Sequence, residues 1–415
     1  MDTGDTAWIL ASSALVLLMT PGLAFFYGGM VRSKTVLNMM MMSFSALAIV
    51  PVLWVLYGYS FAFSPGGNQF LGGFKRLGLQ NISVDTAYGT IPEYVFVGFQ
   101  LMFAIITLAL ISGAIADRAK FSAWIVFSVV WITVVYFPVA HWVFDFGDNG
   151  GWIATKLKAV DFAGGTAVHI NAGAAGLALA LVLGKRVGWR RDPMRPHNLP
   201  FVLLGAGLLW FGWFGFNAGS AVGANGLAGL AFVNTAVATA AAIIGWLAVE
   251  FFRDKKGTSL GAASGAVAGL VAITPAAGAL SPFGSILLGL VAGVLCALAV
   301  GLKYKLGYDD SLDVVGVHLV GGLVGTLLIG LLAVGDGLFY GGSLDLLGKQ
   351  FVAAFVVLAY SFVLTYVIGK LIDVTIGFRV SEEDEVTGID QVEHLETAYD
   401  YAGSSSGGSN LLKEL

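Results

Sequence analysis

Long apolar runs alternate with short polar stretches along most of this chain. Residues 201–216 and 287–302, for example, contain no charged side chain. A helix of about 20 residues is needed to cross the roughly 30 Å hydrocarbon layer of a membrane. Eleven segments fit this requirement, so we expect an all-α integral membrane protein with eleven transmembrane helices. The segments are residues 6–31, 37–63, 92–115, 121–140, 161–184, 199–218, 227–252, 258–278, 283–302, 313–334 and 348–372.

The basic residues are divided unequally between the two sides of this predicted bundle. When the loops are numbered alternately from the N-terminus, seventeen of the 22 basic residues fall on one side. The other side holds Lys75, Arg76, Lys156, Lys158 and Lys349. Cytoplasmic loops carry an excess of Lys and Arg, so we expect the N-terminus outside and the C-terminus inside. The acidic Asp2 and Asp5 argue against a cleavable signal peptide, which has a basic start.

Composition and domain organisation agree with an integral membrane protein. The 415 residues are 57% hydrophobic and 12% charged, whereas soluble proteins have about 25% charged residues. We expect one transmembrane domain, residues 1–374, followed by a cytoplasmic regulatory tail, residues 375–415, that is flexible after about residue 402. The single cysteine, Cys296, allows no disulfide within the chain. No motif for metal, cofactor or nucleophile chemistry is evident, so we expect no enzyme activity, no cofactor and no nucleic-acid partner.

Two of the predicted segments share a pattern around a histidine. In residues 161–184 and 313–334 an aspartate opens the segment, and glycines follow the histidine at four and seven residues. The histidines are His169 and His318. Segments five helices apart run in opposite directions, as in transporters built from inverted repeats with a site near mid-membrane. We therefore expect inverted halves at about residues 6–185 and 199–334, with residues 348–372 as an added helix.

The paired histidines are the first candidate functional residues. A single buried histidine is often a core residue bonded to a backbone carbonyl, but ionisable groups inside a membrane are costly and usually functional. Glycines on the same side of each helix would allow neighbouring backbones to approach closely. Neutral imidazole both donates and accepts hydrogen bonds, so we expect the pair to line a conduction path.

Several segments closely resemble the ammonium transporter (Amt/Mep/Rh) family, on its bacterial and archaeal Amt side. The likeness covers about 370–400 residues in the right order. It is carried by residues 21–29 (PGLAFFYGG), 113–118 (GAIADR), 161–171 (DFAGGTAVHIN), 213–220 (WFGFNAGS), 313–318 (DVVGVH) and 380–399. This resemblance implies eleven helices per subunit, a homotrimer with a pore through each subunit, and the cytoplasmic membrane of a prokaryote as the location.

The resemblance also implies roles for individual residues. Two stacked phenylalanines gate the pore, and its twin histidines are flanked by a tryptophan and a threonine. An outer vestibule recruits ammonium with an aromatic residue and a serine, near an aspartate. The C-terminal tail couples the subunits to a PII signalling protein. The matching positions are Phe103 and Phe216; His169 and His318; Trp213 and Thr274; Phe144, Ser220 and Asp161; and Gly388, Asp390 and Tyr399.

The vestibule departs from the family pattern at one position. Phe144 stands where the family has a tryptophan, and a phenyl ring attracts cations more weakly than an indole. Trp142 is an alternative recruitment residue. Asp161 is either a helix N-cap or a direct attraction for the cation, and for Asp313 we favour capping. We expect His141 at the vestibule surface and His197 and His394 in solvent.

These residue types suit a small cation that crosses as a neutral molecule. Ammonium and potassium are similar in size, but an unpaired charge is costly in a dry pore, and only ammonium can escape that cost by releasing a proton. We therefore expect recruitment of ammonium or methylammonium, deprotonation at the phenylalanine gate, and conduction of ammonia with or without the proton. The alternatives are an Rh-like channel for neutral NH3 or CO2, and an ammonium sensor with little transport.

Overall fold

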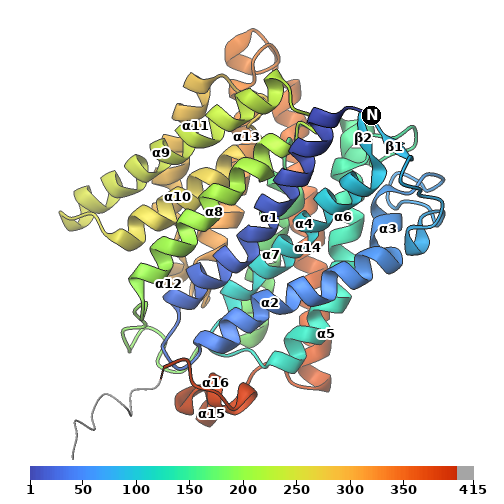
Figure 1. The fold of residues 1–415 in the computed structure, drawn as a ribbon. Helices are drawn as coiled ribbons and strands as arrows, with labels where there is room; N and C mark the ends of the chain where they lie inside the picture. The colour runs from blue at the N-terminus through green and yellow to red at the C-terminus, as the bar shows by residue number, and fades with distance from the viewer. Residues whose placement is uncertain (400–415) are drawn as a thin grey trace, which may run out of the picture.

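The computed structural model describes residues 1–399, and Figure 1 shows long helices that cross the molecule between two opposite faces. The N-terminus lies at the upper face in Figure 1, and the C-terminal segment of the described chain lies at the opposite face, here named the tail face. The first half contains α1 (Thr3–Met30), α2 (Val36–Leu53), η1 (Trp54–Gly58), α3 (Tyr59–Phe63), η2 (Leu77–Leu79), β1 (Ala87–Tyr88), β2 (Ile91–Pro92), α4 (Glu93–Ile111), η3 (Ser112–Ile115), α5 (Phe121–Trp131), η4 (Ile132–Tyr136), α6 (Phe137–Phe144), η5 (Ile153–Leu157), η6 (Gly165–Ile170) and α7 (Asn171–Leu183).

The second half of the described chain is also helical. Its elements are α8 (Leu199–Gly219), α9 (Gly226–Asp254), α10 (Ser259–Ile273), α11 (Pro282–Ala299), α12 (Leu302–Leu306), η7 (Val315–Leu319), α13 (Val320–Leu332), η8 (Leu338–Tyr340), α14 (Leu344–Thr375), α15 (Glu382–Thr387) and α16 (Ile389–His394). The exception to an all-helical fold among described residues is the two-residue strand pair β1–β2, which pairs antiparallel in a loop.

The predicted apolar segments all coincide with helices of the described chain. Ten helical stretches are long and apolar enough to cross a membrane, and α10 is a shorter apolar helix of 15 residues. At about 1.5 Å per residue, α10 spans about 22 Å, and the turns that follow it extend to Leu280. The prediction of an all-helical bundle is thus confirmed, whereas the number of crossings, the orientation and the domain limits stay predictions.

The two histidine segments begin with matching irregularities. Each starts as a π-helical turn, η6 or η7, and continues as a regular α-helix, α7 or α13. The packing is reciprocal, because α7 contacts η7 while α13 contacts η6. π-Helical turns are rare and often occur at functional sites, so the pattern shared by the two sequence segments extends to their backbones.

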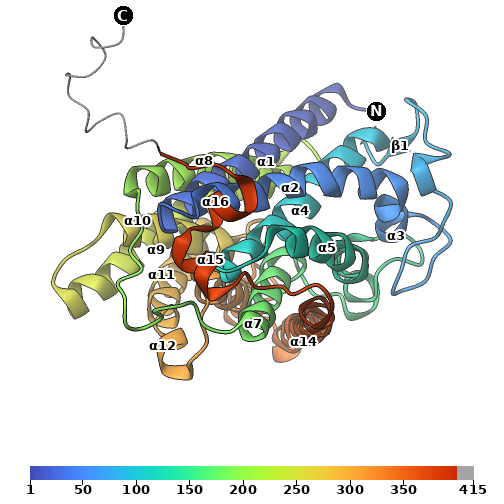
Figure 2. The same ribbon diagram turned by 90° about the horizontal axis from the view of Figure 1, so that it is seen from below.

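The segment after α14 folds against the tail face, where α15 and α16 lie beside the ends of the long helices (Figure 2). The Asp390 carboxylate accepts hydrogen bonds from the backbone nitrogens of Leu37 and Asn38, at 3.0 and 2.8 Å. Burial raises the pKa of this carboxyl, and those hydrogen bonds oppose the rise. The expected flexibility after about residue 402 lies outside the described residues.

Two histidines on the tail face differ from our expectation of solvated side chains. The His197 imidazole contacts the Tyr399 hydroxyl at 2.7 Å and the Val31 carbonyl at 2.9 Å. His394 Nε2 lies 3.0 Å from the Asn38 side-chain oxygen. Both histidines join the C-terminal segment to the helical bundle, which single sequence segments could not reveal because the partners are more than 150 residues away.

Candidate functional site

Three cavities follow one another along the length of α1. Asp5, near its start, lines a cavity of about 680 Å³ at the upper face, here named the upper cavity. Met19 and Leu23 line a cavity of about 10 Å³ that His169 and His318 also line, here named the histidine cavity. Met30, at the end of α1, lines a cavity of about 470 Å³ at the tail face, the tail-side cavity. The succession traces a candidate path through the protein.

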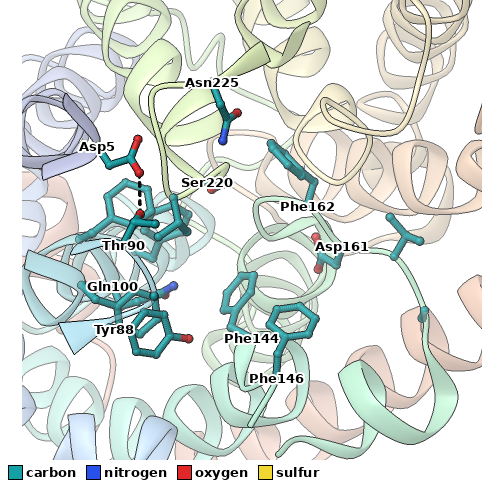
Figure 3. A pocket seen from close by; sticks show the side chains of 17 residues that line it. Asp5, Tyr88, Thr90, Gln100, Phe144, Phe146, Asp161, Phe162, Ser220 and Asn225 are labelled. Carbon is teal, nitrogen blue, oxygen red and sulfur yellow. Dashed lines mark hydrogen bonds between the residues drawn. The ribbon is translucent and has the colours of Figure 1, made fainter. Parts of the chain in front are cut away.

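The upper cavity collects three of the four predicted recruitment residues. Figure 3 shows Phe144, Asp161 and Ser220 around one space, with the 2.6 Å hydrogen bond from Thr90 to Asp5 at its edge. The Ser220 hydroxyl donates to the Phe216 carbonyl at 2.8 Å, so its oxygen lone pairs remain available to a ligand. Aromatic rings and acceptor oxygens are the groups that hold a small cation. The cavity therefore has the chemistry of a cation-recruiting vestibule.

Trp142, the alternative recruitment residue, lies elsewhere. Its indole nitrogen donates to the Phe70 carbonyl at 2.9 Å, and its ring lies 4.6 Å from that of Tyr360 on α14. It is not among the residues that line the upper cavity. Trp142 and Phe144 are two positions apart on α6, and residues at that spacing point in different directions on a helix. Phe144 thus faces the cavity while Trp142 packs against α14.

His141 also differs from our expectation of a vestibule surface residue. It is 1% exposed, and its ring nitrogens lie 2.7 Å from the carbonyls of Ala62 and Asn68. Those contacts tie α6 to α3 and to the loop that follows it, partners that are 73 residues or more away along the chain. His141 is therefore a buried packing residue of the upper face.

The Asp161 carboxylate is occupied by the helix that follows it. It accepts hydrogen bonds from the backbone nitrogens of Gly164, Gly165 and Thr166 at 2.6–2.8 Å, and also from the Thr166 hydroxyl. Of the two readings left open by the sequence, this geometry favours the helix N-cap, with the carboxylate also on the wall of the upper cavity.

Two phenylalanine rings separate the upper cavity from the histidine cavity. Phe103 from α4 lines the upper cavity, and Phe216 from α8 lines the histidine cavity. Their ring centroids are 4.2 Å apart with an interplanar angle of 28°, a stacked arrangement. Both rings are fully buried. The stacked pair thus lies where the linings of the two cavities meet.

The two predicted pore histidines face each other just beyond the phenylalanines. His169 and His318 have Nδ1 atoms 3.3 Å apart and stacked rings. Because one hydrogen bond needs one donor and one acceptor, only one of the two Nδ1 atoms can carry the shared proton. His169 Nε2 is buried and has no hydrogen-bond partner within the described chain, and the rest of the histidine cavity is lined by apolar and aromatic side chains. The pair can therefore present both a lone pair and an N–H group to a small molecule.

Glycines bring the two histidine helices together. A Cβ on Gly173, four residues after His169, would lie 2.5 Å from the backbone nitrogen of Leu319. A Cβ on Gly322, four residues after His318, would lie 3.2 Å from the Cβ of His169. The close backbone approach that the glycine spacing predicted is confirmed, and it is what allows the imidazoles to meet.

Trp213 and Thr274 support the histidine pair from one side. The Trp213 ring stacks on that of His169 with centroids 5.5 Å apart, and its indole nitrogen donates to the Thr274 hydroxyl at 2.8 Å. The Thr274 hydroxyl donates in turn to the Leu270 carbonyl at 2.7 Å. Trp213 lines the histidine cavity, whereas Thr274 acts through Trp213. This chain of hydrogen bonds fixes the orientation of the indole.

Below the histidines, the capping of the second helix differs from our expectation. Asp310, not Asp313, accepts hydrogen bonds from the backbone nitrogens of Val314 and Val315, at 3.1 and 2.8 Å. The Asp313 carboxylate instead forms an ion pair with Lys303 at 2.7 Å. Lys303 was not among the predicted site residues, although a lysine at the end of an apolar run, just before an aspartate-rich loop, could have indicated it.

The fold and this path define a class, an all-helical membrane transport protein. The Ammonium Transporter Family matches residues 7–399. An ammonium transporter from Mycobacterium tuberculosis (strain ATCC 25618 / H37Rv) is 60% identical over 437 residues, covering 97% of this chain and 92% of its own length. The chain therefore belongs to the ammonium transporter family and is a multi-pass membrane protein.

Solved structures agree with this assignment. The crystal structure of Candida albicans Mep2 has a TM-score of 0.84 and 35% identity, and the match covers 92% of this chain and 88% of that one. A structure described as a sensor Amt protein has a TM-score of 0.88 and 28% identity, with 94% and 98% covered. The expected family and its overall fold are thus confirmed.

Proposed function

We propose that this protein carries ammonium across the membrane by recruiting the cation in the upper cavity and passing ammonia through the histidine cavity. The observation that supports this most directly is the histidine cavity itself. Its volume of about 10 Å³ is near the lower limit of about 10–15 Å³ for holding one water-sized molecule. Apart from two imidazoles its walls are apolar or aromatic, so a bare cation would find few ligands there.

Recruitment uses the groups that face the upper cavity. The Phe144 ring attracts the cation through its π-face, and the Ser220 oxygen accepts a hydrogen bond from it. Asp161 and Asp5 add negative charge to the wall and rim, which raises the local cation concentration. Trp142 is left out of this set because its indole is engaged with Phe70 and Tyr360.

Selectivity arises at the stacked pair of Phe103 and Phe216. Removing an ion from water into such surroundings costs several kcal/mol even after relaxation. Ammonium avoids that cost by transferring its proton to water in the upper cavity, and potassium has no proton to transfer. Because the two Nδ1 atoms of His169 and His318 bond to each other, their Nε2 atoms are left to offer ammonia one lone pair and one N–H group. The Nδ1–Nδ1 contact can pass a proton along the pair.

The wider architecture is part of the proposal. We infer eleven crossings in two inverted halves, about residues 6–185 and 199–334, with residues 348–372 as an added helix. The matching π-helical turns η6 and η7 and their reciprocal packing support the repeat. The N-terminus would lie outside the cell membrane and the tail in the cytoplasm. A homotrimer, and regulation by a PII protein through Gly388, Asp390 and Tyr399, complete the proposed arrangement.

The proposal is tested by reconstituting the protein in liposomes and recording methylammonium uptake and ammonium-evoked current with and without potassium. We expect uptake that potassium does not inhibit. Equal competition by potassium would rule out the deprotonation step. Uptake without current would favour a neutral-gas channel, and binding without uptake would favour a sensor.

Variants of the two histidines test their proposed role in uptake and in selectivity against potassium. The acidic replacements His169→Asp and His318→Glu should either abolish uptake or allow potassium to compete, because a carboxylate is a ligand for a bare cation. Phe214→Leu is the matched control for Phe216→Leu, since Phe214 lies on the same helix but stacks on Phe232, away from the pore. Wild-type uptake and selectivity in both acidic variants would remove the histidines from the mechanism.

A further inference from the structure

The tail-side cavity continues the candidate path below the histidines. Three elements that line the histidine cavity also reach the tail-side cavity: α1 through Leu23 and then Met30, α10 through Val267 and then Leu260, and the segment around η7 through His318 and then Asp313. The spacings of seven, seven and five residues correspond to about 7–10 Å along a helix. The tail-side cavity is therefore the mouth through which a molecule leaving the histidines would pass.

A buried lysine lies in the wall of this mouth. Lys303, in α12, is 7% exposed and lines the tail-side cavity together with Asp313. Its ammonium nitrogen lies 2.7 Å from a carboxylate oxygen of Asp313 and donates to the backbone carbonyl of Asp310 at 2.9 Å. One carboxylate and one carbonyl are oxygen ligands of the kind that a small monovalent cation takes. The group that these two oxygens contact in this structure, the Lys303 side-chain ammonium, is itself an alkylammonium ion.

The other charged groups nearby are already engaged or lie on another wall. The Asp310 carboxylate caps the helix that carries His318. Arg186, which also lines the cavity, pairs with Asp309 at 2.8 Å and with Asp117 at 3.1 Å. Arg190, Arg191 and Asp192 line the cavity from the loop after α7. Of these groups, Lys303 is thus the cation that contacts the Asp313 carboxylate.

The backbone supports a specific role for this pair. Asp313 has φ +64°, the left-handed conformation, which is uncommon for a residue other than glycine. Such a conformation is strained and persists when the surroundings hold it in place. In this conformation the Asp313 carboxylate pairs with Lys303, whereas the backbone amides of Val314 and Val315 donate to Asp310.

We propose that Lys303 is a specificity-determining residue that acts as a tethered cation, filling a monovalent-cation site at the tail-side mouth. Free potassium or ammonium entering from the tail face finds the Asp313 carboxylate already neutralised, so the mouth holds no ion and ammonia leaves unhindered. Removing the ammonium group of Lys303 would convert the same oxygens into a vacant site. This inference rests on the proposed function for its consequence in transport, but the site itself can be tested without transport.

The test compares three variants in liposomes of phosphatidylcholine and phosphatidylglycerol. Lys303→Met keeps the length of the side chain and removes its charge, and Lys303→Met/Asp313→Asn removes both charges. Lys305→Met is the matched control, because Lys305 is an exposed lysine of the same short helix. Methylammonium uptake is measured with potassium or with the bulky cation N-methylglucamine on both sides of the membrane.

We expect potassium to lower uptake by Lys303→Met about tenfold or more, and to leave the wild type, the double variant and Lys305→Met unaffected. A second measurement is binding of radioactive rubidium to the purified protein in detergent, where Lys303→Met should bind one ion that the double variant does not bind.

Uptake by Lys303→Met that is insensitive to potassium, or no difference in rubidium binding, would overturn the inference. A merely structural role would lower thermal stability in both charge variants without any potassium dependence, which overturns it as well. Absence of uptake in the wild type would instead contradict the proposed function, and the rubidium result would still decide the site.

Discussion

Replacing Gly173 with alanine is expected to separate the two histidines of the pore. The added Cβ would lie 2.5 Å from the backbone nitrogen of Leu319 and 2.6 Å from the Leu319 Cβ. Because non-bonded atoms need about 3.5 Å, α7 and the turn that carries His318 must move apart by about 1 Å. The 3.3 Å contact between the two Nδ1 atoms would then exceed hydrogen-bonding distance.

The size of the effect follows from that displacement. A misplacement of about 1 Å at a reacting group can lower a rate about 100-fold, and forced overpacking costs about 1–3 kcal/mol of stability. We therefore expect Gly173→Ala to lose most methylammonium uptake in liposomes, while thermal unfolding in detergent shows a moderate loss of stability and a protein that still folds.

Two further glycines make the series quantitative. A Cβ on Gly322 would lie 3.0 Å from Ile170 Cγ1 and 3.2 Å from His169 Cβ, so Gly322→Ala should lose less uptake than Gly173→Ala. A Cβ on Gly207, within α8, would meet nothing within 4 Å, and alanine there should be neutral or stabilise by up to about 1 kcal/mol. Wild-type uptake in Gly173→Ala, or an equal loss in Gly207→Ala, would refute the argument that close backbone approach sets the histidine geometry.

Three other changes have defined outcomes. Phe144→Trp should strengthen the cation–π attraction by about 0.5–1 kcal/mol. The half-saturating methylammonium concentration should then be about two- to fivefold lower. An unchanged value would mean that Phe144 does not contact the cation. Burial raises the pKa of Asp310 to about 6. Between about pH 4 and 6 the folded protein therefore holds a proton that the unfolded chain releases. As a result, the free energy of unfolding falls as pH rises through that range. Asp310→Asn should flatten this dependence in thermal unfolding, and an identical slope would contradict it. Trp213→Phe removes the hydrogen bond to Thr274 and should cost about 1 kcal/mol together with part of the uptake, whereas Trp210→Phe, on the same helix but outside the pore, should retain uptake.

The positions of the long helices could be predicted from the sequence because each apolar run must be buried either in lipid or in the bundle. The same reasoning found the histidine pair, since an ionisable group inside such a run is costly and stands out. The glycine spacing also predicted the close approach of the two helices, because residues four apart lie on one side of a helix. These are local periodic signals, and no distant partner is needed to read them.

The directions of side chains near the ends of the helices could not be predicted in this way. Trp142 and Phe144 are both aromatic residues of α6, yet only Phe144 lines the upper cavity, because α14 takes up the Trp142 ring. Likewise Asp310 and Asp313 both precede η7, and either one could cap it by sequence spacing. The presence of Lys303 from a preceding helix decides that Asp313 forms an ion pair and Asp310 is the cap.

The sequence by itself thus determined the class of this protein and its helices, and it indicated candidate residues for the path, because hydrophobic burial and the cost of polar groups in apolar surroundings act on local segments. Only the tertiary structure decided that His197 contacts Tyr399, that the two imidazoles share one hydrogen bond, and that Lys303 lines the tail-side mouth. The first two contacts join residues more than 100 positions apart, and the third depends on the direction of one side chain. All three are therefore set by how the helices pack and not by any segment alone.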